Sequence, residues 1–153
     1  MKTSQNAFKL IGLKLEGKTT NENNQSNKVC GLLWQQFESG NFREIIPGKL
    51  SDDIYAVYFD YEHQDKAVFF YFIGCRAEDT ATAPAGLQAL QIPGQHYEKY
   101  TAKGVMTGCI TDQWMAIRES GIRRLFGFDF ELYDQKSRDW SNAEVDICVS
   151  VVG

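Results

Sequence analysis

The chain has 153 residues and a formal net charge of −4, with 43% hydrophobic and 24% charged residues. That length suits a single domain with a sizeable core. A nucleic-acid binder usually carries a basic stripe, whereas the densest basic cluster here, Arg118 with Arg123 and Arg124, is interrupted by Glu119. We therefore expect no direct nucleic-acid binding, and the mild acidity fits a cationic partner better.

Short motifs exclude several further classes of protein. The four cysteines (Cys30, Cys75, Cys109 and Cys148) include no CxxC pair, so we expect neither a metal site nor a redox centre. Neither GxGxxG nor GxxxxGKS/T occurs, so no phosphate loop and no cofactor are expected. The opening residues lack the apolar stretch of a signal peptide, and no apolar run is long enough to span a membrane. Free thiols in a reducing cytoplasm are the simplest interpretation.

The chain opens with a predicted strand, a loop and a helix. Residues 7–15 (AFKLIGLKL) predict the strand, and residues 17–28 are polar and rich in asparagine, which is typical of a loop. A lid over the ligand is the alternative for this loop. Ser26 or Asn27 is suited to cap a helix over 28–39, where apolar residues recur at the spacing of an amphipathic face.

A hairpin and a linker follow. Residues 54–61 (IYAVYFDY) and 67–77 (AVFFYFIGCRA) are rich in β-forming residues and predict two paired strands, joined by a charged turn at 62–66. Residues 78–85 are small and include a proline, so they predict a linker inside one domain. The next strand is predicted over 86–92 and continues over 95–102.

The last part of the chain predicts a helix and two strands. Thr111 or Asp112 is suited to cap the helix, which ends near Gly121. Residues 128–134 (FDFELYD) and 143–152 (AEVDICVSVV) predict the strands, because apolar and polar residues alternate in each.

The strand at 128–134 has two different faces, because strand side chains alternate. One face carries Phe128, Phe130 and Leu132, and the other carries Asp129, Glu131 and Tyr133. Our hypothesis is that the second face is half-enclosed and that Glu131 is the charged residue of a ligand cleft.

The order strand, helix, strand, strand occurs twice, which predicts an internal duplication. Trp34 and Trp114 occupy similar places in the two predicted helices, and Tyr58 aligns with Glu131. The prediction is a single domain over 1–153, with repeats at about 7–77 and 86–152. Its fold class is α+β: tandem βαββ units related by a pseudo-two-fold axis, with an antiparallel sheet, two helices on one side and a central groove.

The duplication assigns the two faces of the sheet. The face expected to pack on the helices carries Val57, Phe59, Val68, Phe70, Phe72, Phe128, Phe130, Leu132, Val145, Ile147, Val149 and Val151. The face expected to line the groove carries Tyr58, Phe69, Tyr71, Asp129, Glu131, Tyr133, Asp146 and Cys148. This second face is too aromatic for a plain solvent surface.

Several groove candidates have a structural alternative. Tyr58 and Tyr71 are either core residues or a wall for cations. Trp34 and Trp114 are expected to pack helix on sheet, with rings large enough to reach the groove. Asp129 and Asp146 are expected to be solvated, although they share the groove face. Glu131 against aromatic walls would be desolvated, which raises the pKa of a carboxyl; a cation would restore its charge.

Four stretches together resemble the GyrI-like small-molecule-binding family, the effector-binding domains of AraC- and MerR-type regulators. They are LLWQQF, IYAVYFDYE with FFYFIGC, AGLQALQIPGQHYEKYTAKG, and the final W…FDFELYD…VDICVSV. The form is most similar to the stand-alone or integron-associated members. The resemblance implies the same duplicated fold and a groove for lipophilic, often cationic compounds. It also implies that the glutamate of FDFELYD, Glu131, is the charge partner.

The expected function is capture of a lipophilic ligand, for which a cation is predicted, in an effector sensor or a drug-sequestering protein. The residues expected to bind it are Glu131, Tyr58, Phe69, Tyr71, Trp34, Trp114 and Tyr133. The resemblance also implies two alternatives. One is a hydrolase of reactive electrophiles with Glu131 as general base and Tyr71 or Tyr58 as proton donor. The other is a gyrase-inhibitor-like interaction module. The DNA-binding domain of the family's regulators is not expected here; a homodimer or a partner regulator remains open.

Overall fold

The computed structural model describes residues 1–20, 25–62 and 68–153. Residues 63–66 of the expected turn at 62–66, and residues 21–24 of the expected loop or lid, lie outside these ranges. In the described residues, no helix is long and apolar enough to cross a membrane.

The predicted strands and helices occur in the predicted order, and three further elements, Lys2–Gln5, Thr19–Thr20 and Phe42–Ile45, were not predicted. The strands are β1 (Lys2–Gln5), β2 (Phe8–Lys14), β3 (Thr19–Thr20), β4 (Ile54–Glu62), β5 (Val68–Ala77), β6 (Gln88–Ile92), β7 (Gln95–Gly104), β8 (Asp129–Tyr133) and β9 (Ala143–Val151). The helices are α1 (Gln25–Ser39), α2 (Phe42–Ile45) and α3 (Met106–Glu119), with a 3-10 turn η2 (Gln135–Ser137). The two βαββ units are therefore β2-α1-β4-β5 and β7-α3-β8-β9, which confirms the predicted fold class.

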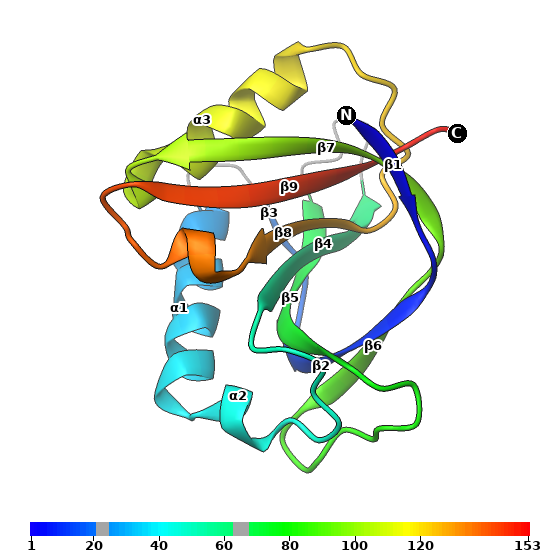
Figure 1. Cartoon of the computed structure of the whole chain (residues 1–153), viewed down its shortest axis with the longest axis vertical. Coiled ribbons are helices and arrows are strands. Elements are labelled where there is room, and N and C mark those ends of the chain that lie inside the picture. Colours follow the sequence, from blue (N-terminus) through cyan, green and yellow to red (C-terminus); the bar gives the residue numbers. More distant parts are fainter. Residues whose placement is uncertain (21–24, 63–67) are drawn as a thin grey trace.

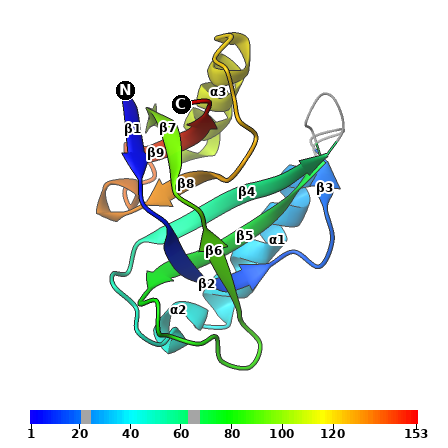
Figure 2. The same cartoon turned by 90° about the vertical axis from the view of Figure 1, so that its right-hand side faces the viewer.

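One curled antiparallel sheet holds both units, in the order β1-β7-β9-β8-β4-β5-β2-β6, with β3 added beside β5. The units join along β4 and β8, where Ile54 pairs with Tyr133 and Tyr58 with Asp129. β1 pairs with β7, while β2, which directly follows β1, pairs with β6. The consecutive strands β1–β2 and β6–β7 therefore pair along one antiparallel ladder. This ladder joins the two ends of the strand order and curls the sheet into a half-barrel (Figures 1 and 2).

Both faces of the sheet are buried, and this corrects the predicted faces. The helix face packs α1 through Leu33 and Phe37, and α3 through Trp114 and Ile117. The opposite face is covered by the ladder of β1–β2 with β6–β7. Its core consists of Phe8, Leu10, Val57, Phe59, Phe72, Ile92, Tyr97, Phe130 and Cys148.

The prediction is right for Ile147 and Val149, which pack against α3. It is wrong for Val57, Phe59, Phe72 and Phe130, which belong to the helix-free core, and for Cys148, which was expected in the groove. Val57, Phe72 and Phe130 share one face, as predicted, but the helices pack on the other face, with Tyr58 and Tyr71. Strand register explains the residues of β9: Phe130 lies opposite Cys148, so the two share a face, and Glu131 lies opposite Ile147. Periodicity within each strand leaves that register undetermined.

Both long helices begin earlier than predicted. α1 already includes Ser26 and Asn27, so neither is its cap. α3 begins at Met106 and not near Thr111. A tertiary contact stabilises its first turn, because the Met106 N–H donates to the Trp140 carbonyl at 2.8 Å. The helix has no side-chain cap at Val105. The sequence near Met106 therefore gives no sign that the helix begins there.

The first unit contains an unusually close approach of two strands. Gly12 of β2 lies opposite Gly74 of β5. A Cβ on Gly12 would overlap the carbonyl oxygen of Ile73, and a Cβ on Gly74 would overlap that of Ile11. The absence of both side chains allows the sheet to coil tightly here.

We expect Gly12→Ala to lower the free energy of unfolding by about 1–3 kcal/mol or more, because the added methyl group overlaps backbone atoms. The matched control is Gly108→Ala in α3, where an added Cβ meets no atom within 4 Å. That change should raise stability by up to about 1 kcal/mol through helix propensity. Urea unfolding measures both, and equal effects would contradict the close approach.

Candidate functional site

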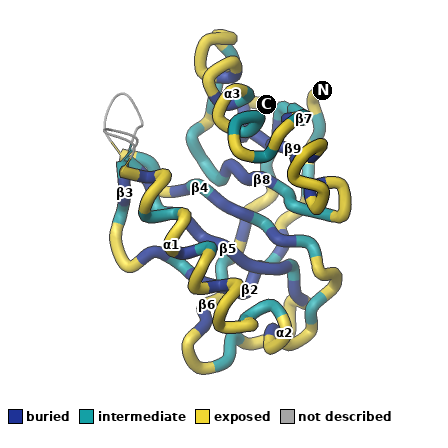
Figure 3. Tube along the Cα trace, turned by 90° about the vertical axis from the view of Figure 1, so that its left-hand side faces the viewer, coloured by how far each residue is buried: buried dark blue, intermediate teal, exposed yellow. Residues whose placement is uncertain are grey.

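A cavity of about 560 Å³ lies on the helix face, between α1 and α3 and above the junction of β4 and β8. Figure 3 shows the buried central strands between these two helices. Of the described residues, these line the cavity: Ser26, Asn27, Cys30, Gly31, Trp34, Tyr58, Tyr61, Phe69, Tyr71, Ile110, Thr111, Trp114, Arg118, Arg124, Glu131 and Tyr133. The volume lies within the range of about 300–1,000 Å³ that is usual for small-molecule sites.

The structure brings all seven predicted groove residues into this wall: Trp34, Tyr58, Phe69, Tyr71, Trp114, Glu131 and Tyr133. They come from both units, with α1, β4 and β5 on one side and α3 and β8 on the other. Their contact with a ligand stays a prediction. Asp146 and Cys148, which were expected on the same face, are not among the residues that line the cavity.

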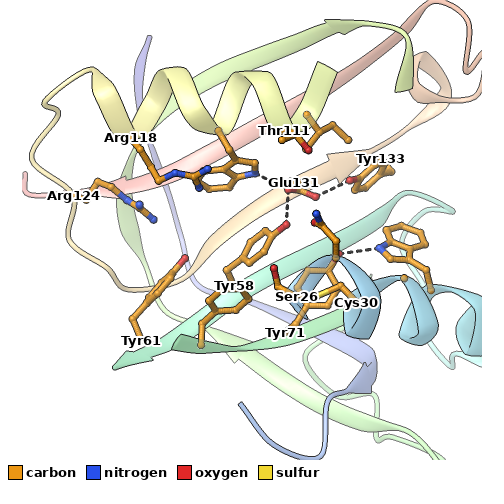
Figure 4. Close-up of a pocket in the computed structure, with 16 residues that line it drawn as sticks. Ser26, Cys30, Tyr58, Tyr61, Tyr71, Thr111, Arg118, Arg124, Glu131 and Tyr133 are labelled. Carbon is orange, nitrogen blue, oxygen red and sulfur yellow. Dashed lines mark hydrogen bonds between the residues drawn. The ribbon is translucent and has the colours of Figure 1, made fainter. Parts of the chain in front are cut away.

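Glu131 lies at the centre of the cavity wall and is only 1% exposed. Its Oε2 accepts hydrogen bonds from the Tyr58 hydroxyl and the Trp114 indole N–H, both at 2.7 Å. Its Oε1 accepts from the Tyr133 hydroxyl at 2.6 Å. Figure 4 shows these donors converging on the carboxylate. Ala56 lies directly opposite Glu131 in the ladder, and its small side chain leaves room for the diagonal Tyr58 phenol.

The charge of Glu131 has only neutral partners. Burial raises the pKa of its carboxyl, and the hydrogen bonds from Tyr133, Trp114 and Tyr58 partly oppose that rise. No lysine or arginine of the described residues forms an ion pair with it. Burial and the nearby Glu131 charge raise the pKa values of Tyr58, Tyr71 and Tyr133 well above the usual range. At neutral pH these phenols are therefore donors, not anions.

Edge-to-face aromatic pairs build the wall around the carboxylate. The Tyr58 ring centroid lies 5.0 Å from that of Tyr71, 5.2 Å from that of Phe69 and 5.4 Å from that of Trp114. Trp34 packs on Tyr133 at 5.0 Å. Such pairs hold ring orientations that a cation can exploit.

Sequence reasoning missed a second buried carboxylate close to the first. Asp129 is fully buried, not solvated as predicted. Its Oδ1 accepts from the backbone N–H and the hydroxyl of Ser150, both at 2.7 Å. Its Oδ2 accepts from the Tyr61 hydroxyl at 2.6 Å and from Arg124 Nη2 at 2.7 Å. Asp129 lies two residues before Glu131 on β8, so the two side chains point to the same face. This alternation is the sequence signal that predicts burial of Asp129 beside Glu131. Asp146 was also expected to be solvated but is only 7% exposed.

The thiol in the cavity wall, that of Cys30, is not activated as a nucleophile. Burial, and secondly the Glu131 charge, raise the pKa of the Cys30 thiol to about 12, so it is neutral. In the part of the chain that the structure describes, no cluster of three or more histidine, cysteine or acidic side chains could hold a metal ion.

A wider hollow of about 1,190 Å³ adjoins the cavity and shares Gly31, Trp34, Ile110 and Tyr133 with it. Its outer wall includes Trp140, which is 64% exposed. The Trp34–Tyr133 pair therefore stands between an inner cavity around Glu131 and an open approach to it.

Comparison with known proteins gave a family and a set of similar folds. The family model for integron-associated effector-binding proteins matches residues 3–151. The transcriptional regulator BrlR of Pseudomonas aeruginosa is 27% identical over 153 residues, which cover 95% of this chain and 52% of the regulator. The chain thus spans about half the length of that curated relative.

Solved structures share the fold at low sequence identity. SAV2435, solved bound to tetraphenylphosphonium, has a TM-score of 0.78 at 16% identity, over 100% of this chain and 93% of that one. An integron cassette protein from the mobile metagenome of Vibrio cholerae has a TM-score of 0.74 at 21% identity, over 99% and 95% of the two chains.

We expect Tyr133→Phe to destabilise the protein by about 1–3 kcal/mol at neutral pH, because Glu131 Oε1 loses its hydroxyl donor. The variant should also raise the pKa of Glu131 further, since that bond lowers it. The loss is present where Glu131 is ionised and shrinks as pH falls through its raised pKa.

Urea unfolding at several pH values measures this dependence. Tyr100→Phe is the matched control, because the Tyr100 hydroxyl bonds Ser120 and no carboxylate. A Tyr133→Phe loss that stays constant from neutral to acidic pH would contradict the role assigned to the Glu131 charge.

Proposed function

We propose that this chain, which belongs to the family of integron-associated effector-binding proteins, captures lipophilic cations in the cavity around Glu131. One observation carries the proposal. Glu131 is a buried carboxylate that three neutral donors hold in place and that has no cationic partner among the described residues.

A cationic ligand supplies the positive charge that those neutral donors lack. Hydrogen bonds from phenol and indole groups orient the carboxylate, but they do not neutralise it. In a cavity of low effective dielectric, a ligand cation near Glu131 gains more Coulomb energy than it would in water. The rings of Tyr58, Phe69 and Trp114 add cation–π and stacking contacts. A neutral analogue gains only the apolar part of this energy.

The relatives support this class of ligand. SAV2435 was solved with tetraphenylphosphonium, which is a lipophilic cation, and BrlR is a transcriptional regulator. We propose that residues 1–153 act as one effector-binding domain, as a sensor for a partner regulator or as a sequestering protein. Four free cysteines support a reducing, cytoplasmic setting for it.

A hydrolase is the second candidate, because the buried Glu131 has a raised pKa and lies beside phenols that can donate protons. The hydrogen-bond pattern favours capture over hydrolysis. Three donors already occupy Glu131 and reduce its basicity, which weakens it as a general base. Mass spectrometry of a cyclopropane-containing electrophile decides the matter: hydrolysis above a Glu131→Gln control would establish the enzyme.

We expect Glu131→Gln to weaken tetraphenylphosphonium binding about thirtyfold or more, equivalent to about 2 kcal/mol. Binding of neutral triphenylphosphine oxide should change much less, because it makes no charge pair. Fluorescence of Trp34 and Trp114, which lie in the cavity wall, measures both affinities. Equal affinity of both compounds for both proteins would refute the charge-pair mechanism.

Binding of a cation should also depend on pH. A proton competes with the cation for Glu131, whose pKa is raised by burial. Affinity should be flat above that pKa, fall by up to about tenfold per pH unit below it, and level off near the affinity of Glu131→Gln. Titration calorimetry over about pH 8 to 4 tests this, with Glu131→Gln as the pH-independent control. A fall that begins only in the range of an exposed glutamate would contradict the raised pKa.

A further inference from the structure

The cavity that holds Glu131 also contains two arginines, Arg118 of α3 and Arg124 of the loop after it. Neither pairs with Glu131. Figure 4 shows both at the end of the cavity away from Tyr133, with the Arg124 guanidinium pointing inward. The cavity therefore carries charges of both signs at separate places.

Aromatic rings hold the Arg124 guanidinium in a fixed place. Its centre lies 4.3 Å from the Phe126 ring centroid, 5.6 Å from that of Trp114 and 5.7 Å from that of Tyr61. The side chain is 13% exposed. An arginine held in this way loses little further entropy when it binds an anion.

The hydrogen-bonding capacity of Arg124 is only partly used. Asp129 takes one bond, from Nη2, and the Tyr61 hydroxyl also accepts a bond from Arg124. Arginine and a carboxylate commonly pair through two parallel bonds, but Ser150 already occupies Asp129 Oδ1. Arg124 Nε is buried and has no hydrogen-bond partner among the described residues. A buried donor without an acceptor is costly, so Arg124 keeps an unused hydrogen bond for any ligand oxygen that comes within its reach.

Arg118 adds a second positive charge at the same end. It is exposed, lies one turn after Trp114 on α3 and lines the cavity. Among the ion pairs of the described residues, none involves Arg118. Unlike Arg124, it neutralises no buried carboxylate, so its charge is available to a ligand.

Trp114 sets the spacing between the two charged places. Its indole N–H donates to Glu131, while Arg124 lies against its ring face. A flat ligand along this indole can therefore reach Glu131 with one group and the arginines with another.

We propose that the preferred ligand is an aromatic zwitterion, with a cationic group at Glu131 and a carboxylate at Arg124 and Arg118. This inference rests on the proposed function, since it extends the cation site by a second, anion-binding part.

A pair of dyes isolates the second part. Rhodamine 110 and its methyl ester, rhodamine 123, share one cationic xanthylium ring and differ in whether the carboxylate is free. We expect the wild-type protein to bind the free acid about tenfold more tightly, measured by fluorescence anisotropy. Ionic strength near 0.15 M limits long-range attraction, because the screening length is then about 8 Å.

Variants assign the preference to its residues. Arg118→Gln and Arg124→Lys should each reduce the acid-to-ester ratio, and near-ultraviolet circular dichroism checks their folding. The matched control is Arg123→Gln, which makes the same charge change at an exposed residue outside the cavity wall and should keep the ratio. Glu131→Gln should lower the affinity for both dyes by the same factor.

The outcomes separate the two proposals. If wild-type protein binds both dyes equally, or prefers the ester, the zwitterion inference is overturned and cation capture stands. An acid preference that survives both arginine variants also overturns it. If neither dye binds, or Glu131→Gln changes neither affinity, the cation site itself fails.

Discussion

The carboxylate of Glu131 is buried at the junction of the two central strands, and no residue in the described ranges gives it an opposite charge to offset its burial. Three hydrogen bonds stabilise its ionised form, and their donors belong to β4, α3 and β8. Each donor is fixed in turn by the packing of its own element. The position of α3 over the sheet, the register of β4 against β8 and the rotamers of three aromatic residues are thus all constrained by one ionisable group.

The duplicated units have the same topology but different chemistry. The first supplies most of the aromatic wall, through Trp34, Tyr58, Phe69 and Tyr71. The second supplies the charged groups: Glu131 and both arginines. A symmetric ancestor would present the same groups twice, so this asymmetry gives the cavity a direction. The arginines lie at one end of the cavity and Tyr133 lies at the other, so an elongated charged ligand has one favourable orientation.

Alternation and repetition along the chain were sufficient to predict the main strands and helices and the duplicated fold, and together with the family resemblance they brought Glu131 and its aromatic neighbours into one site. They failed where a second strand or a distant residue decides the outcome. Phe130 shares a face with Cys148 only because of the β8–β9 register, and the first turn of α3 depends on Trp140. Arg124 lies in a loop without periodicity, so nothing local connects it with Asp129. Its role is visible only once the fold places both beside Tyr61.

The ladder that joins β1–β2 to β6–β7 affects the range of ligand sizes that this protein can accept. It closes a second core on the face away from the cavity, with residues from both units, such as Leu10, Phe72 and Phe130. The floor of the cavity is therefore backed on its far side and cannot deepen. α1 and α3 form the walls, and each packs on the sheet through one face. Adjustment to molecules of different width therefore falls to the helices, while the charge pattern on the floor stays constant.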